Sequence, residues 1–204
     1  LQMRSKGFGR YEVQPAGDRA YFAPLSYIEP LTGRNLKALG FDISTVPAAR
    51  NALERARDTG EAALSATLTL RQDADRKDSA GVVMYLPIYT KPNDPDTVEG
   101  RRQALLGWVS APIRVHEMLH GMARQLDSDI GLRINDLDAP EATALLYGNQ
   151  TTGESDLHET RRLEVGGRTW LLSMHALPRF EQRFENNNQT LNAMLGVALS
   201  LMVG

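Results

Sequence analysis

Two consecutive glycines divide the last strongly patterned part of the chain into two strands. Residues 161–165 and 168–176 are predicted to be strands, and Gly166-Gly167 between them suits the primed turns that close two-residue β-hairpins. The other apolar segments are also short, and no helix regularly follows a strand as it would in a parallel sheet. The order of elements therefore predicts an α+β fold built on antiparallel sheets.

Apolar residues elsewhere in the chain follow the two-residue period or form short runs. Residues 64–70 alternate strictly between apolar and polar side chains, which predicts one half-buried strand. Residues 81–89 are almost wholly apolar and are typical of a central strand, with Pro87 at its end or at a bulge. Further strands are predicted over 19–28, 105–111, 129–135 and 143–147, and a long polar loop over 91–103.

Helical spacing of small and apolar residues predicts two helices. The first covers 47–59, because Ser44 or Thr45 can cap it, Pro47 suits its first turn and Gly60 suits its C-terminal end. Its apolar stripe consists of Ala49, Ala52, Leu53 and Ala56. The second helix falls within 112–126, with a stripe of Val115, Met118, Leu119, Met122 and Leu126. A last helix is expected after Pro178.

Composition excludes some classes of function. The net charge of −2 over 204 residues argues against nucleic-acid binding, and the absence of cysteine is compatible with an exported domain. The chain begins with Leu1, which suggests a segment of a longer protein. Residues 191–204 are apolar and uncharged, so we expect either the start of a membrane helix or a terminal helix docked on the core.

Several motifs between residues 27 and 60 resemble one family of sensory domains. They are Y-I-E-P at 27–30, N-L-K-A-L-G-F-D at 35–42 and R-A-R-D-T-G at 55–60, followed by L-T-L-R-Q at 68–72, V-M-Y-L-P-I-Y at 83–89 and L-L-G-W-V at 105–109. Together they resemble the CHASE domain, an extracytoplasmic sensory module of histidine kinases, diguanylate and adenylate cyclases and plant cytokinin receptors. The resemblance extends over about 11–190 and is closer to the bacterial branch of the family.

The resemblance implies a fold and a cellular setting. It implies a CHASE sensor domain over 1–190 with two PAS-like lobes, a distal ligand-binding lobe at about 21–111 and a proximal lobe at about 129–176, joined by a connecting helix. A terminal helix would lead to the membrane at 191–204. The domain would lie in the periplasm or outside the cell, between membrane helices of a receptor. It would form a homodimer through a stalk helix that precedes this chain.

The same resemblance implies sensing without catalysis and without a cofactor. A small molecule, adenine-like or cytokinin-like in the plant members, would bind the distal lobe, and a kinase or cyclase elsewhere in the receptor would provide the output. Asp42 matches an aspartate that accepts hydrogen bonds from the adenine group, and a carboxylate suits such donors. The other residues expected to wall the site are Leu64, Tyr85, Leu86 and Gly107.

Simpler roles are open for each of these residues. Asp42 could cap the following helix or pair with an arginine, and the other four could be ordinary core positions. If Asp42 contacts the ligand, Asp42→Ala should weaken binding and leave the fold largely intact. A domain that binds nothing and only dimerises is a further hypothesis.

A second motif points to a different function. His116-Glu117-Met118-Leu119-His120 has the H-E-x-x-H pattern of zinc peptidases, in which the two histidines share a zinc ion and the glutamate acts as general base. No third histidine follows at the extended spacing, although Glu141 could be a third ligand. The alternative is a solvated histidine pair on the polar side of the helix. A zinc-dependent metallopeptidase is therefore the second hypothesis for function.

Overall fold

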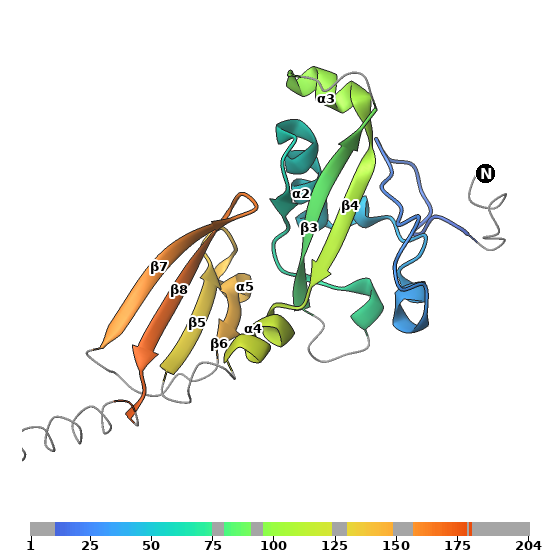
Figure 1. The fold of residues 1–204 in the computed structure, drawn as a ribbon. Helices are drawn as coiled ribbons and strands as arrows, with labels where there is room; N and C mark the ends of the chain where they lie inside the picture. The colour runs from blue at the N-terminus through green and yellow to red at the C-terminus, as the bar shows by residue number, and fades with distance from the viewer. Residues whose placement is uncertain are drawn as a thin grey trace, which may run out of the picture.

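The chain forms two four-stranded antiparallel sheets accompanied by a few short helices (Figure 1), which confirms the predicted α+β class. The computed structural model describes residues 11–74, 80–90, 96–123, 130–148, 157–178 and 180. The N-terminal sheet contains β1 (Ala63–Leu64), β2 (Leu68–Thr69), β3 (Ala80–Tyr89) and β4 (Leu105–Ile113). The C-terminal sheet contains β5 (Ile130–Asp136), β6 (Leu145–Gly148), β7 (His158–Val165) and β8 (Arg168–Ala176), in the order β6-β5-β8-β7.

Strand β3 is the centre of the N-terminal sheet, as its apolar run predicts. It pairs with β1 and β2 along one side and with β4 along the other. Pro87 lies inside the strand opposite Trp108, just before a register shift at Ile88 and Tyr89. Because successive side chains point to opposite faces, Val83 and Tyr85 share one face and Val82, Met84 and Leu86 share the other.

Helix α2 (Pro47–Thr59) covers the Val83 and Tyr85 face of the N-terminal sheet. All four residues of its predicted stripe are buried there, namely Ala49, Ala52, Leu53 and Ala56. Gly60 ends the helix in the left-handed conformation, with φ of 80°. The predicted bounds and the C-terminal glycine are confirmed, but the predicted cap is wrong, because the N-cap is Val46 and the hydroxyls of Ser44 and Thr45 donate to Asp42 instead.

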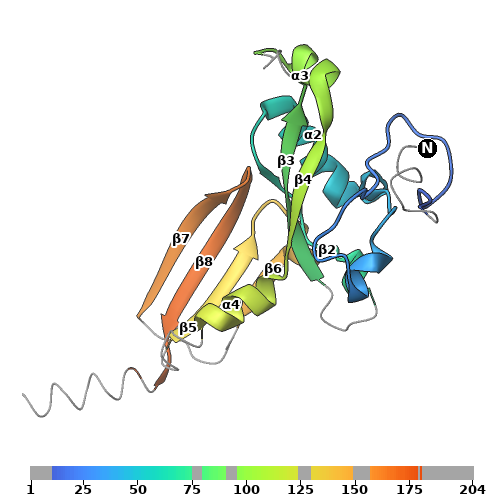
Figure 2. The same cartoon turned by 45° about the vertical axis from the view of Figure 1, so that its right-hand side comes forward.

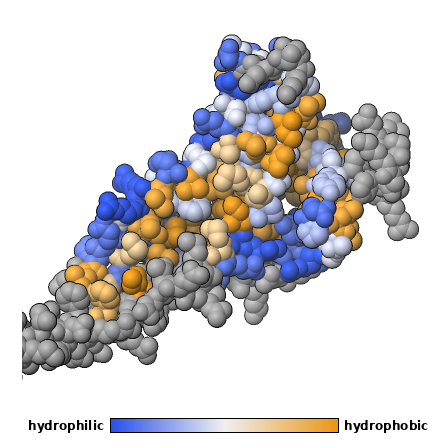
Figure 3. Space-filling model, in the orientation of Figure 1, coloured by the Kyte–Doolittle hydropathy of each residue, from blue (hydrophilic) through white to orange (hydrophobic). Residues whose placement is uncertain are grey.

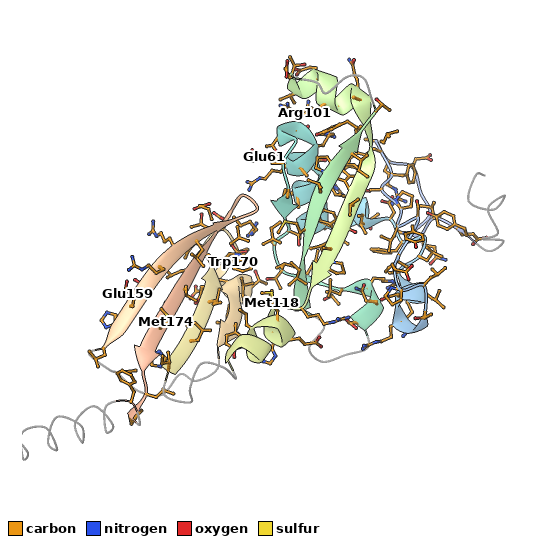
Figure 4. The ribbon with its side chains drawn as sticks, in the orientation of Figure 1. Glu61, Arg101, Met118, Glu159, Trp170 and Met174 are labelled. Carbon is orange, nitrogen blue, oxygen red and sulfur yellow. The ribbon has the colours of Figure 1, made fainter. Side chains whose placement is uncertain are left out.

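Helix α4 (Val115–Ala123) connects the two sheets and contributes to a core that both of them share. Val115 and Leu119 are buried in it, but Met118 is 43% exposed, so the predicted stripe is wrong at that residue. The N-terminal sheet contributes Leu64 and Val82 to this shared core. The C-terminal sheet contributes Leu132, Ile134, Tyr147 and Trp170, the last of which lies between the two sheets in Figure 4.

The β7–β8 hairpin forms as the glycine pair predicts. Gly166 and Gly167 have φ of 55° and 74°, and Val165 pairs with Arg168 across the turn. Positive φ at both central residues is the requirement of the type I′ turn. The tip of this hairpin reaches the N-terminal sheet and α2 in both ribbon views (Figures 1 and 2).

Some predicted elements are wrong. Residues 19–28 form no strand and make only an isolated bridge, Pro24 with Asp42, because the segment bonds to 40–43 at scattered points instead of along a ladder. The strand predicted over 64–70 is two short strands, β1 and β2, on one side of β3. The predicted polar loop over 91–103 includes most of α3 (Val98–Ala104), which Thr97 caps by accepting a hydrogen bond from the Gly100 amide at 3.1 Å.

The remaining elements are short, and the ends of the chain lie outside the described residues. They are the 3₁₀ turns η1 (Gly33–Lys37), η2 (Ile43–Thr45) and η3 (Arg71–Asp73), and helix α5 (Glu141–Ala144). Within the part of the chain that the structure describes, no helix combines the length and apolar character needed to cross a bilayer. The expected membrane helix at 191–204 and most of the helix expected after Pro178 fall outside that part.

Candidate ligand site

Asp42 lies immediately before η2 and is completely buried. Its Oδ1 accepts hydrogen bonds from the Ala23 amide at 2.9 Å, the Ser44 amide at 3.1 Å and the Ser44 hydroxyl at 2.7 Å. The carboxylate therefore caps η2, the turn that leads into α2, and fixes the segment around Ala23.

The second carboxylate oxygen of Asp42 faces a cation. Arg19 Nη1 lies 3.1 Å from Oδ2, and this buried oxygen makes no directed hydrogen bond to another described residue. The Arg19 guanidinium in turn lies over the Phe22 ring, 4.7 Å from its centroid. The arginine pair weighed for Asp42 is thus present, whereas the carboxylate caps η2 and not the helix α2, whose N-cap is Val46. The ligand contact itself stays a prediction.

Tyr85 does not share a wall with Leu64 and Leu86. Its side chain is 2% exposed in the core beneath α2, and burial raises the pKa of its phenol above the usual range. Leu64 lies opposite Met84, so it belongs to the other face of the sheet and is buried in the core shared with the C-terminal sheet.

Leu86 and Gly107 lie on that same other face, beyond the shared core. Leu86 pairs directly with Val109, and Ile88 pairs with Gly107. We call these four residues the open face. Leu86, Ile88 and Val109 are 50%, 42% and 57% exposed, and a Cβ on Gly107 would meet no described atom within 4 Å. Figure 3 shows hydrophobic residues gathered over β3 and β4 in this region.

The open face is the part of the predicted site that an incoming molecule can reach. Strand β4, which carries Gly107 and Val109, pairs only with β3 among the described strands, so its outer edge offers backbone donors and acceptors beside the apolar side chains. Ile88 and Val109 were absent from the sequence-based site. The two-residue period of β3 indicates Ile88 as a companion of Leu86, whereas Val109 requires the β3–β4 register.

The residues of the zinc-peptidase motif lie on α4. The His116 ring packs against the Tyr147 ring at 5.6 Å between centroids, and the Glu117 carboxylate lies 3.7 Å from Arg114 Nη1. No group of three or more histidine, aspartate or glutamate side chains that could hold a metal occurs among the described residues, to which the side chain of His120 does not belong. The hypothesis stays a prediction, and the zinc content of the purified chain tests it.

A second apolar cleft lies at the far end of the C-terminal sheet. It has a volume of about 430 Å³, and its lining is mainly apolar but includes two histidines and a glutamate. Its lining includes Ile130, Leu157, His158, Glu159 and Met174, of which Figure 4 labels the last two. None of the residues predicted to bind ligand lines this cleft. A binding experiment must therefore distinguish the cleft from the open face.

Comparison with known proteins agrees with a sensory domain and identifies the family. The sequence pattern of the CHASE domain matches residues 1–147, and the chain belongs to this family of extracellular sensory domains. The chain is also similar to hybrid signal transduction histidine kinase A of Dictyostelium discoideum, with 24% identity over 201 residues. That alignment spans 86% of this chain but only 9% of the length of the kinase.

Proposed function

We propose that this domain senses a small molecule outside the cytoplasm and passes the signal to the rest of a transmembrane receptor. The two sheets correspond in this proposal to the distal and proximal PAS-like lobes. The membership of the family supports the sensory role, and the similarity to a hybrid histidine kinase supports a kinase as output. A diguanylate or adenylate cyclase output is the alternative. The domain itself catalyses no reaction and would dimerise through a stalk helix.

The observation that most supports a ligand site is the open face. Three exposed apolar side chains surround a glycine, and among the described residues no atom fills the space in front of this glycine and no strand pairs with the outer edge of β4. Ligand pockets combine apolar walls with a few polar groups, and a backbone edge suits a flat heterocycle such as adenine. Leu86 and Gly107 would contact the ligand directly. Tyr85 would support the open face from the opposite side of the sheet, and Leu64 would support it from the neighbouring shared core.

Asp42 lies apart from the open face, because the Ala23 segment that it binds packs with Val83 and Tyr85 beneath α2, so its contact with a ligand is a separate prediction. Its Oδ1 is fully used by three protein donors, so only Oδ2 could accept from a ligand. Because Oδ2 is buried beside Arg19, a ligand N–H would reach it only after displacing that guanidinium. The carboxylate would then exchange one charged partner for a neutral donor, which is unfavourable unless Arg19 finds other partners.

A thermal-shift screen tests the ligand site. Adenine-type cytokinins and a panel of small metabolites are added to the wild-type chain, to Leu86→Asp and to Leu145→Asp. Leu86 and Leu145 are 50% and 52% exposed, on β3 and β6 respectively, so the two replacements are matched in exposure. A ligand at 100 times its dissociation constant adds about 2.7 kcal/mol of stability, which raises Tm by about 5 °C or more in a domain of this size.

We expect at least one compound to raise Tm of the wild type and of Leu145→Asp, but not of Leu86→Asp, because a carboxylate on the open face would be desolvated by the ligand. An equal shift in all three proteins would remove the open face from the site. A flat screen in all three would leave the domain without any of the tested ligands and would favour a protein partner or a purely dimerising role.

A further inference from the structure

The turn of the β7–β8 hairpin makes direct contact with the N-terminal sheet. The Leu64 amide donates a hydrogen bond to the Gly166 carbonyl at 2.9 Å. The Arg55 guanidinium, on the exposed side of α2, donates to the neighbouring Gly167 carbonyl. Two carbonyls of one turn are therefore held by two different elements of the other lobe.

Space for this contact exists only because the turn has no side chains. A Cβ added at Gly166 would lie 2.8 Å from the Leu64 amide nitrogen and 2.9 Å from the Leu64 Cβ, and it could not be accommodated without moving β1. A Cβ at Gly167 would meet the end of the Arg55 side chain, which can rotate away. Gly166 is thus the residue that the contact requires, while Gly167 is needed mainly for the turn.

On its other side the turn is firmly attached to the C-terminal sheet. Arg168 begins β8 immediately after the turn, and its Nε and Nη2 both lie 2.7 Å from Oδ2 of the buried Asp136. Strand β8 then runs through the C-terminal sheet to Ala176, a length of about 30 Å for nine residues. A displacement of the turn would therefore move the base of β8, whose far end leads to the end of the chain.

The same contact lies on the face of the N-terminal sheet that carries the candidate ligand site. Leu64 lies on the face that carries the open face, opposite Met84, which is two residues from Leu86 along β3. Leu64 also packs in the core shared with Trp170 of β8. Movement of β3 and β4 upon ligand binding would displace Leu64, and Leu64 would in turn displace the Gly166–Gly167 turn.

We propose that the Gly166–Gly167 turn is the joint that couples the ligand-binding sheet to the C-terminal sheet, with Gly166 and Arg55 as its positioning residues. This inference rests on the proposed sensory function and assigns its regulation to named atoms. Coupling requires that the joint differ in free energy between the two signalling states. Weakening the joint changes the resting balance of those states, even when no ligand is bound.

The test compares two asparagine variants of adjacent residues. Gly166→Asn and Gly167→Asn both put a residue that tolerates positive φ into the turn, but only the first collides with the backbone of β1. Arg55→Ala removes the second contact from an exposed helix position, and Asn51→Ala, exposed on the same helix, is its control. Folding of each variant is checked by circular dichroism.

The first measurement is the distance between the lobes by electron spin resonance. The chain has no cysteine, so spin labels on Gln103→Cys of α3 and Thr160→Cys of β7, two exposed sites, report one distance between the N-terminal and C-terminal lobes. We expect one population in the parent and in Asn51→Ala, a second population in Gly166→Asn, and smaller, similar changes in Gly167→Asn and Arg55→Ala. An unchanged distribution in folded Gly166→Asn and in Arg55→Ala would overturn the proposal.

The second measurement is the output activity of the full-length receptor without added ligand. We expect Gly166→Asn to change it by about fivefold or more, as is typical of coupled sites, and Asn51→Ala to leave it unchanged. An altered distance with unchanged output would make the turn a structural contact only and would overturn the coupling. Neither measurement uses a ligand, so a flat thermal-shift screen would count against the proposed ligand site and not against the joint.

Discussion

Replacing Asp42 by alanine is expected to lower the free energy of unfolding by about 3 kcal/mol, because it leaves buried donors without an acceptor. The Ala23 amide and the Ser44 amide both donate to Asp42 Oδ1, and neither donates to another described side chain. Arg19 also loses the anion beside it. Denaturant unfolding of the wild type and the variant measures the change.

Asparagine at position 42 is the matched control. Asp42→Asn keeps an oxygen for the donors at Ala23 and Ser44 but removes the charge that faces Arg19, so we expect about half the loss. An alanine variant as stable as the wild type would show that Asp42 does not hold this segment. The structure thus replaces the expectation from sequence that Asp42→Ala leaves the fold largely intact, and Asp42→Asn is the better probe of ligand contact.

Replacing Asp136 by alanine is expected to cost about 3–5 kcal/mol, the usual effect of removing one partner of a buried ion pair. Asp136 is completely buried and Arg168 is 14% exposed, with the guanidinium at 2.7 Å from the carboxylate. Asp136 Oδ1 also accepts from the Asp138 amide at 3.1 Å. The alanine variant leaves the charged Arg168 guanidinium without its anionic partner and with little access to water.

A double replacement separates the charge from the packing. Asp136→Leu combined with Arg168→Met removes both charges and fills a similar volume, so we expect it to recover most of the lost stability. Chemical denaturation of the wild type, the single variant and the double variant gives the comparison. A double variant as unstable as Asp136→Ala would mean that the surrounding backbone depends on the polar groups themselves and not on their pairing.

The elements that sequence predicts well are those whose signals are local. Helix α2 has its proline, its small-residue stripe and Gly60 within fourteen residues, and the β7–β8 hairpin has its glycine pair. Helix α3 was missed because one capping residue, Thr97, and two turns of polar sequence do not differ from a loop by composition. The strand predicted over 19–28 does not form, because the hydrogen bonds of this segment to 40–43 are long-range and irregular.

The candidate site was only partly accessible from sequence. Adjacent residues of a strand face opposite sides, so Tyr85 and Leu86 could not line one wall, and the pattern alone suffices to exclude that arrangement. The sharing of one face by Leu64, Leu86 and Gly107 depends on the register of β1, β3 and β4, which no local pattern contains. Arg19 was missed as the cationic partner of Asp42 because it lies 23 positions away in the chain.

The most direct test of a ligand site on the N-terminal sheet is a nuclear magnetic resonance titration of the isotope-labelled chain with the strongest stabilising compound from the screen. We predict that the backbone amide signals of Leu86, Ile88, Gly107 and Val109 shift with one common dissociation constant. Shifts confined to Ile130, Met174 and the other residues of the cleft in the C-terminal sheet would contradict the account, because they would place the ligand in the lobe that we assign to signal transmission.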